Sequence, residues 1–186
     1  MSAYIISTDR LGLRNWKESD IDPFIDMNKD EAVMEFFPRI LTDEESKSLV
    51  SIFLNHFEDH GFTYYAVEKL NDQEFIGFIG LKYQTFESDF TPCVDIGWRI
   101  KRAAWNFGYA TEGAKACLEY GFKALDLKEI LAFTPCSNEK SQNVMKKIGM
   151  SKVATFEHSR MLAYDHLKDC VVYKKMLTNE SNYLDR

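Results

Sequence analysis

The segment 94–122 brings together the residue types that could do chemistry. Residues 94–100, VDIGWRI, are mostly apolar but include Asp95, and their β-branched and aromatic content predicts a strand. From Ala114 onward, apolar residues recur every three or four positions, which predicts a helix with one buried face. The segment therefore predicts a strand that carries an acidic residue, followed by a turn and a helix.

The turn, residues 106–108, is a candidate anion site. Gly108 tolerates backbone angles and a close ligand approach that a side chain would block. A helix that begins near residues 108–110 leaves its first amide groups unpaired and carries a partial positive charge, so it can receive a phosphate. An ordinary turn explains the same features equally well. The chain contains no GxGxxG and no GxxxxGK[ST] sequence, which argues against dinucleotide-binding and P-loop domains.

The same run resembles motif A of the GCN5-related N-acetyltransferases, the GNAT superfamily. It is most similar to the branch of bacterial ribosomal-protein N-terminal acetyltransferases, which commonly reads EIGYWLxPxxWGKGYATEA. In this chain DIGWRI and WNFGYATE stand at the same spacing, with Asn106 in place of a glycine and Phe107 in place of a residue that is often basic. We expect Asn106 to be tolerated in a left-handed conformation, which Asn accepts. Losing the basic side chain at Phe107 would weaken the grip on a pyrophosphate.

Two further segments resemble the same branch. Residues 8–20, TDRLGLRNWKESD, are similar to its TxRLxLRxWxxxD opening, and residues 138–150, NEKSQNVMKKIGM, are similar to its NxxSxxVxxKxGF segment. The resemblance thus covers nearly the whole chain. We predict a single GNAT domain over residues 1–177, followed by a polar C-terminal tail over residues 178–186.

The resemblance implies an α/β (α+β) fold: a mixed, mostly antiparallel sheet of about seven strands with helices on both faces. The strand that holds Asp95 and the strand that begins at Glu129 would splay apart, and acetyl-CoA would lie in the gap. The free backbone edge of residues 98–100 would pair with the pantetheine like an added strand. The cofactor-binding residues that the resemblance implies are Trp98, Arg99, Ile100, Trp105, Asn106, Phe107, Gly108, Tyr109, Ala110, Thr111, Asn138 and Ser141.

Transfer of an acetyl group to an amine needs a base, an oxyanion donor and an acid for the leaving thiolate. We predict Asp95 as the base and Ser141 as the acid, with a backbone amide near residues 98–99 serving the oxyanion. Asp95 could instead pair with Arg99 or Lys101, and Ser141 could be an early-turn residue of a helix that Asn138 caps. An α-amino group with a pKa near ~8 is about a tenth neutral at pH 7 and can nearly do without a base. A lysine-like amine with a pKa near ~10.4 is almost entirely protonated at pH 7 and needs a general base.

The acceptor side is less defined by the sequence. Residues 159–168 form a linker that, together with His158, could bind an acceptor, although the pattern slightly favours a solvated surface loop. The candidate acceptor-binding residues are Trp16, Phe37, Glu87, His158 and His166. Acidic residues such as Glu87 and Asp89 suit a cationic acceptor, and Trp16 and Phe37 could equally fill the core.

Hydrophobic patterns place the remaining elements. They predict strands over residues 5–15, 62–70, 74–83, 129–134, 152–158 and 169–176, and short helices over 20–28 and 31–37. Thr42 and Glu45 form a capping box for a helix that ends near Gly61. A further helix opens at Asn138 and stops at Gly149.

Composition excludes several function classes. The 186 residues suit one globular domain, and a net charge of −6 disfavours nucleic-acid binding. No apolar run is long enough to span a membrane, and no signal segment opens the chain, so we expect a cytoplasmic protein without a membrane partner, as a monomer or homodimer. The four cysteines form no CxxC pair, and His56 and His60 lack a third ligand, so no metal is expected.

Three functions remain open. The first is an enzyme that acetylates the N-terminus of a protein or peptide. The second is an enzyme that acetylates a small amine, such as a polyamine, an aminoglycoside or an amino-acid derivative. The third is an acyl-CoA-binding regulator without turnover.

Overall fold

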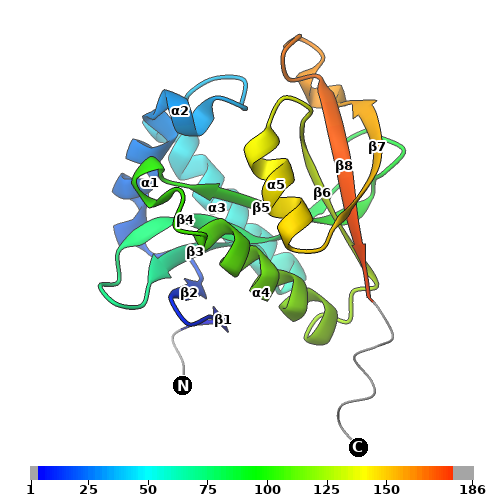
Figure 1. Ribbon diagram of the computed structural model, residues 1–186. Helices are drawn as coiled ribbons and strands as arrows, with labels where there is room; N and C mark the ends of the chain where they lie inside the picture. The colour runs from blue at the N-terminus through cyan, green and yellow to red at the C-terminus, as the bar shows by residue number, and fades with distance from the viewer. Residues whose placement is uncertain (1–3, 178–186) are drawn as a thin grey trace, which may run out of the picture.

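The computed structural model describes residues 4–177, which form an open eight-stranded sheet (Figure 1). The strand order is β1-β2-β3-β4-β5-β6-β8-β7, and all neighbouring strands are antiparallel except β5 and β6. The strands are β1 Ile6–Ser7, β2 Leu11–Arg14, β3 Tyr64–Lys69, β4 Phe75–Gln84, β5 Cys93–Ile100, β6 Glu129–Pro135, β7 Ser151–Glu157 and β8 Asp169–Met176. The predicted mixed, mostly antiparallel sheet is confirmed, while the predicted tail, residues 178–186, lies outside the described residues.

Helices cover both faces of the sheet, as predicted. Helices α4 and α5 lie on one face, and α1 and α3 lie on the other (Figure 1). The helices are α1 Ile21–Lys29, α2 Glu31–Met34, α3 Asp43–His60, α4 Tyr109–Lys123 and α5 Glu139–Lys147. Among residues 4–177, no helix combines the length and the apolar character that crossing a membrane requires.

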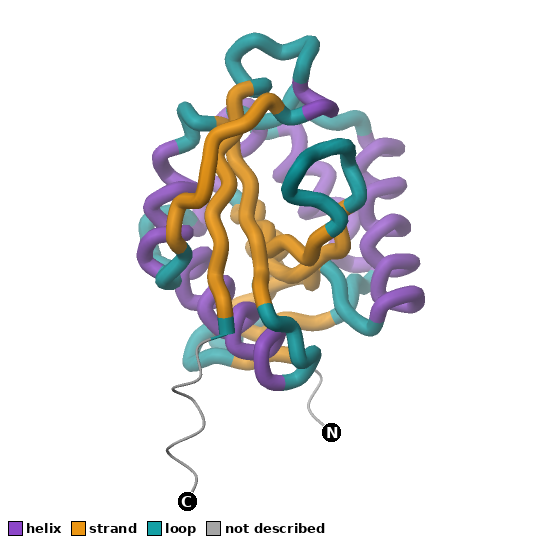
Figure 2. Tube along the Cα trace, turned by 90° about the vertical axis from the view of Figure 1, so that its right-hand side faces the viewer, coloured by secondary structure: helices purple, strands orange, loops and turns teal. Residues whose placement is uncertain are grey.

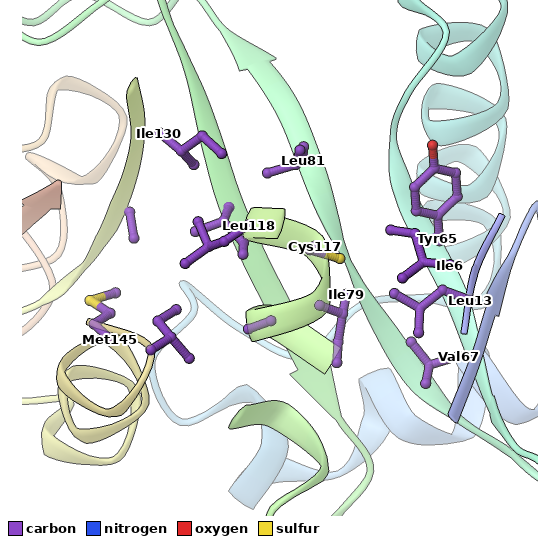
Figure 3. Packing of buried hydrophobic residues seen from close by; sticks show 14 of the residues in the cluster. Ile6, Leu13, Tyr65, Val67, Ile79, Leu81, Cys117, Leu118, Ile130 and Met145 are labelled. Atoms are coloured by element: carbon purple, nitrogen blue, oxygen red, sulfur yellow. The ribbon is translucent and has the colours of Figure 1, made fainter. Parts of the chain in front are cut away.

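The larger core lies between the sheet and α4 (Figure 3). Cys117 and Leu118 of α4 are buried beside sheet residues such as Leu81. The helix can approach this closely because Gly113 and Gly121 face the sheet: a Cβ at Gly113 would lie 2.4 Å from the Ile79 side chain. This packing fixes where α4 begins, and therefore where the turn before it lies.

The second core, on the other face, is aromatic. Trp16 packs its ring against Phe24 and Phe53, with ring centroids 4.8 and 5.6 Å apart, and its indole nitrogen donates to the carbonyl of Tyr64 at 2.8 Å. Tyr64 stacks on Phe78 at 5.3 Å. This core therefore supports the strand positions from which Tyr64 reaches the site described below.

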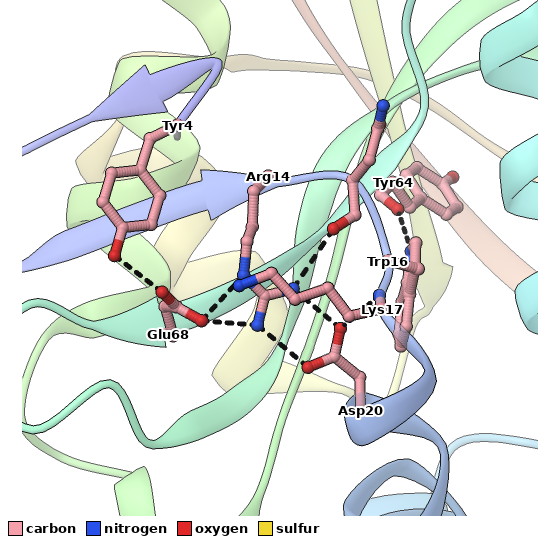
Figure 4. Close-up of polar contacts among 8 residues, drawn as sticks. Tyr4, Arg14, Trp16, Lys17, Asp20, Tyr64 and Glu68 are labelled. Atoms are coloured by element: carbon pink, nitrogen blue, oxygen red, sulfur yellow. Dashed lines mark hydrogen bonds and ion pairs between the residues drawn. The ribbon is translucent and has the colours of Figure 1, made fainter. Parts of the chain in front are cut away.

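A buried charged cluster fastens β2 to its neighbours (Figure 4). Arg14, 4% exposed, donates to Asp20 at 2.7 Å and to Glu68 at 2.7 Å, and Glu68 also accepts from Tyr4. Because each buried charge has an opposite partner, removing one of them would leave the other uncompensated. We assign this cluster to the stability of the N-terminal part of the sheet.

The sheet opens between β5 and β6. The two strands are in register at a single pair, Asp95 opposite Leu131, whereas β4 and β5 pair over the whole of β5. Figure 2 views the molecule from the side of β6, β8 and β7, which run side by side. The splay predicted between the strand of Asp95 and the strand from Glu129 is confirmed.

The N-terminal strand differs from the prediction of one strand over residues 5–15. The chain turns at Thr8, whose hydroxyl accepts from the amide of Leu11 at 2.9 Å, and this local bond divides the segment into β1 and β2. The division also explains why the sheet has eight strands where about seven were predicted. The predicted capping box of Thr42 and Glu45, and the stop at Gly61 with φ of 77°, are confirmed.

Candidate active site

A cleft of about 1000 Å³ lies where β5 and β6 diverge, and it extends to the start of α4, to α5 and to α2. Nearly all the predicted cofactor and catalytic residues line it. Those lining it are Asp95, Trp98, Arg99, Ile100, Trp105, Asn106, Gly108, Tyr109, Ala110, Thr111, Asn138 and Ser141. Phe107 does not line it: its side chain is 59% exposed and stacks beside Tyr109.

The turn before α4 has the backbone geometry of a cradle. Asn106 has φ of 66° and Gly108 has φ of 82°, so the left-handed conformation predicted for Asn106 is confirmed. No side chain caps the helix, and its first amides, at residues 109–111, have no acceptor within the helix. An anion placed here would meet unpaired N–H groups and the positive end of the helix dipole.

Arg10, from the N-terminal segment, makes contacts that stabilise this turn. Its Nη1 donates to the carbonyl of Phe107 at 3.0 Å, its Nε donates to Glu112 at 2.7 Å, and its guanidinium lies 4.7 Å from the centre of the Tyr109 ring. A positive charge therefore stands beside the turn, where the sequence has phenylalanine in place of the basic residue. Sequence reasoning did not assign Arg10 to the site, because its contacts with Phe107 and Glu112 span about a hundred residues.

Asp95 is a buried carboxylate in the wall of the cleft, 7% exposed. Tyr64 donates to its Oδ1 at 2.6 Å and Gln84 donates to its Oδ2 at 3.1 Å. Burial raises the pKa of Asp95 to about 6, although both hydrogen bonds favour the charged form. The alternative that Asp95 pairs with Arg99 or Lys101 is wrong, because Arg99 donates to Asn28 and Lys101 pairs with Glu74.

Asn138 and Ser141 begin α5 on the opposite side of the cleft. The Asn138 side chain accepts from the amide of Ser141 at 3.1 Å, so the predicted capping role of Asn138 is confirmed. Within residues 4–177, the hydroxyl of Ser141 has no hydrogen-bond partner of its own. It is available to a group bound in the cleft.

The acceptor candidates divide into two groups. Phe37 and His158 line the cleft, and the His158 ring stacks on Phe86 with centroids 4.2 Å apart. Trp16 belongs to the aromatic core, because its indole is committed to the Tyr64 carbonyl. Glu87 and His166 are exposed and do not line the cleft; the neighbour of His166, Leu167, is the residue that turns inward.

Besides Arg10, sequence reasoning missed residues of β3 and β4. Tyr64, Phe78, Lys82 and Gln84 line the cleft on the same face of the sheet as Asp95, and Lys82 lies opposite Asp95 in register. These four residues belong to no sequence motif that would mark them as site residues. Pairing β4 with the strand of Asp95, and β3 with β4, could have found them, since directly opposed residues of neighbouring antiparallel strands share a face.

His56, one of the two histidines considered as metal ligands, uses both ring nitrogens in contacts with the backbone. His56 lies with Nδ1 2.7 Å from the carbonyl of Phe62, and its Nε2 accepts from the amide of Tyr83 at 3.0 Å. Across the part of the chain that the structure describes, no group of three or more His, Cys, Asp or Glu side chains gathers to hold a metal ion.

Comparison with known proteins identifies the family. Residues 10–151 match the family model described as "Acetyltransferase (GNAT) domain". The chain is 33% identical over 153 residues to the uncharacterized N-acetyltransferase YnaD of Bacillus subtilis. The matched region covers 82% of this chain and 85% of YnaD.

Two solved structures at lower identity share the fold. One is RimL, the ribosomal L7/L12 alpha-N-protein acetyltransferase, in complex with coenzyme A: TM-score 0.74, 17% identity, covering 91% of this chain and 96% of that one. The other is spermidine N-acetyltransferase from Vibrio cholerae with CoA and spermine: TM-score 0.70, 16% identity, covering 91% and 96%. With the family model spanning most of the chain, the protein belongs to the GNAT acetyltransferase family.

Proposed function

We propose that the chain transfers an acetyl group from acetyl-CoA directly to a primary amine, and that the amine is the N-terminus of a protein or peptide. The observation that carries this proposal is the pairing, in one cleft, of a hydrogen-bonded buried carboxylate, Asp95, with the uncapped start of α4. The carboxylate can accept a proton, and the start of the helix can bind an anion. RimL, a protein of similar fold, is described as an acetyltransferase of a protein α-amine.

The residues of the cleft fit acetyl-CoA, which supplies the acetyl thioester. The amides of residues 109–111 would hold the pyrophosphate, and the space above Gly108 is open: a Cβ there would meet only Arg10, at 3.7 Å. Lys140 and Lys147 of α5 also line the cleft and would favour phosphate groups. Beyond Asp95, the edge of β5 that faces β6 has no strand partner, which leaves residues 98–100 able to pair with the pantetheine.

The chain's own groups would then move two protons. With a pKa of about 6, the Asp95 carboxylate is about nine-tenths ionised at pH 7. As the amine nitrogen forms its bond to the acetyl carbon, Asp95 takes the proton that the nitrogen loses, directly or through a water. Ser141 donates its hydroxyl proton to the sulfur as the C–S bond breaks, and the proton that Asp95 has taken then returns to the Ser141 oxygen through water. Tyr64 and Gln84 hold both oxygens of Asp95 and fix its orientation.

An α-amino group suits this site better than a lysine side chain. Its pKa near ~8 lies about two units above that of Asp95, whereas a lysine amine near ~10.4 lies more than four units above it. A carboxylate as weakly basic as Asp95 deprotonates the first more readily. Small amines remain the alternative acceptor class, since the spermidine N-acetyltransferase has the same fold.

Calorimetry with acetyl-CoA, followed by measurement of thiol release, tests the proposal. The acceptor panel holds peptides with free N-termini, the same peptides with blocked N-termini and an internal lysine, polyamines and aminoglycosides. Thiol release only with the peptides that have free N-termini supports the proposal. Thiol release only with polyamines or aminoglycosides assigns the chain to the small-amine class. Binding without release on any class favours an acyl-CoA-binding regulator. An absence of binding overturns the cradle at residues 106–111.

A further inference from the structure

One part of the cleft is lined by Phe37, Tyr64, Phe78, Lys82 and Asp95 and is here termed the acceptor half. It contains a buried cation, Arg99, that has no counterion among the described residues. Arg99 lies on the same face of β5 as Asp95 and is 8% exposed. Its Nη1 donates to the neutral side chain of Asn28 at 2.6 Å, and its Nε is buried without a hydrogen-bond partner in the described part of the chain. In residues 4–177 no carboxylate lies within ion-pair distance of it. Burying an uncompensated charge is unfavourable unless another group supplies the opposite charge.

Aromatic rings hold the guanidinium in place. Its central carbon lies 4.0 Å from the centre of the Phe37 ring and 5.4 Å from that of Phe78. These contacts orient a cation but do not neutralise it. Burial lowers the pKa of Arg99 to about 9, so the side chain stays charged at neutral pH.

Basic side chains outnumber carboxylates among the other charged residues of the cleft. Glu35, which also lines it, is exposed and lies 3.9 Å from Lys140. Lys82 and Arg160 line it, and neither forms an ion pair within the described part of the chain. Asp95 is the carboxylate on this face of β5, and its oxygens already accept from Tyr64 and Gln84. The cleft therefore favours anions here, although the whole chain has a net charge of −6.

Between Asp95 and Arg99 lies an aromatic surface. The two residues are four positions apart on β5, about 13 Å along an extended strand. The stacked rings of Tyr64 and Phe78 lie beside them, with Tyr64 2.9 Å from the position of a Cβ on Gly97. A ligand along this surface would meet a base at one end and a cation at the other.

We propose that Arg99 binds a carboxylate of the acceptor, so that the preferred acceptor carries its acidic group several bonds from the reacting amine, as an acidic peptide does. This inference rests on the proposed acetyltransferase function and narrows its acceptor class. Polyamines and aminoglycosides are disfavoured, because they bring further positive charge to Arg99 and Lys82. A peptide with glutamate or aspartate close to its N-terminus matches both ends of the surface.

Matched acceptors test the proposal. Tripeptide amides with the same N-terminal residue carry either glutamate or glutamine at the second or third position, and thiol release gives kcat and KM for each. At one position at least, the glutamate peptide should have a KM about tenfold to a hundredfold lower, as for a buried charge-assisted bond. Equal values for the pair at both positions would overturn the proposal.

Three variants locate the preference. Arg99→Met keeps the aliphatic stem and the backbone groups that would pair with the pantetheine, so it should abolish the discrimination while leaving the Kd of acetyl-CoA unchanged. Arg99→Lys should restore part of the discrimination. Lys101→Met removes a nearby charge that pairs with Glu74 outside the cleft, so it should keep the full discrimination. Discrimination that survives in Arg99→Met, or loss of acetyl-CoA binding in that variant, contradicts the assignment.

A binding measurement separates this proposal from the enzymatic one. The N-acetylated forms of the same peptides are titrated by calorimetry into the CoA-saturated protein, which needs no turnover. Tighter binding of the glutamate form supports the carboxylate site even if no acceptor is acetylated, in which case only the proposed function fails. If Arg99→Met does not fold, the wild-type pair and Arg99→Lys decide the outcome.

Discussion

At the scale of single residues, the proposed chemistry depends on Asp95. Its carboxylate is buried and held by two donors, and its pKa is raised to about 6 by burial. Asp95→Asn keeps the shape and removes the proposed base. We expect the turnover rate to fall about 100-fold or more, and the rise of activity through pH 6 to disappear. The control is Asp126→Asn, which changes an exposed carboxylate that pairs with Lys128. Equal rates for the two variants would exclude Asp95 as the base.

The same substitution should stabilise the fold. The pKa of Asp95 is higher in the folded chain than its unfolded value of 3.8, so this group favours folding when protonated. Its contribution is complete below pH ~4 and is lost as the pH rises through about 6. Asp95→Asn should therefore be more stable than wild type at pH 7.5, by at most about 3 kcal/mol, and the difference should vanish near pH 4. Urea unfolding at the two pH values measures this.

Tyr64 is expected to position and tune Asp95. Its hydroxyl donates to Oδ1 at 2.6 Å, which favours the charged carboxylate. Tyr64→Phe removes this bond and should raise the pKa of Asp95, so that the lower limb of the pH–rate profile moves to higher pH by about one unit. The rate on the plateau should change less than in Asp95→Asn. A profile that keeps its midpoint would show that the bond does not affect the base.

The sequence predicts the positions of some residues of the candidate site and not of others. Asn106, Asn138 and Asp95 lie in local patterns. The structure places Asn106 in the left-handed region, Asn138 at the cap of α5 and Asp95 on the strand beside the splay, as those patterns predict or imply. Tyr64 and Gln84 enter through strand pairing, and their residue types are ordinary for strands. Trp16 was a candidate for the acceptor side, yet burial of its large apolar ring in the core prevailed.

At the scale of elements, the turn before α4 depends on a contact from the distant N-terminal segment. Arg10 joins the carbonyl of Phe107 and the carboxylate of Glu112, which holds residues 106–108 against the first turn of the helix. We expect Arg10→Met to raise the Kd of acetyl-CoA about tenfold, since both the brace and a nearby positive charge are lost. The KM of the acceptor should not change, because Arg10 does not line the cleft.

The matched control for this prediction is Lys47→Met. Lys47 pairs with Glu44 on the exposed side of α3, away from the cleft. Calorimetry of both variants with acetyl-CoA gives the comparison, and unfolding temperatures show whether the fold is intact. If Arg10→Met binds acetyl-CoA as tightly as Lys47→Met does, the turn holds its conformation without the brace.

Elements were predicted well where their ends are marked by local chemistry. The capping box at Thr42 and the glycine at residue 61 bound α3 as predicted. The predicted helix over residues 31–37 ends earlier, at Met34, because the restriction that Pro38 places on its predecessor marks a limit and not the actual end. The N-terminal strand was predicted as one element because a side-chain bond from Thr8, which turns the chain, leaves no trace in the hydrophobic alternation.

At the scale of the whole molecule, the sheet consists of two parts with little pairing between them. Strands β1 to β5 are continuously paired, as are β6, β8 and β7, but β5 meets β6 at one register pair. Helix α4 contacts both parts through Ile79 and Ile130. We expect this shared core to make residues 1–177 unfold as one domain, in a single transition.

Acetyl-CoA should strengthen the junction between the two parts, because its proposed contacts come from β5, the start of α4 and α5. A ligand that binds only the folded chain stabilises it by about 2.7 kcal/mol at a hundredfold excess over Kd. For a chain of this length, that amounts to a rise of about 5–10 °C in the unfolding temperature. Scanning calorimetry with and without acetyl-CoA measures the shift. Two separate transitions without the ligand would instead mean that the core around α4 does not couple the two parts of the sheet, and that they fold independently.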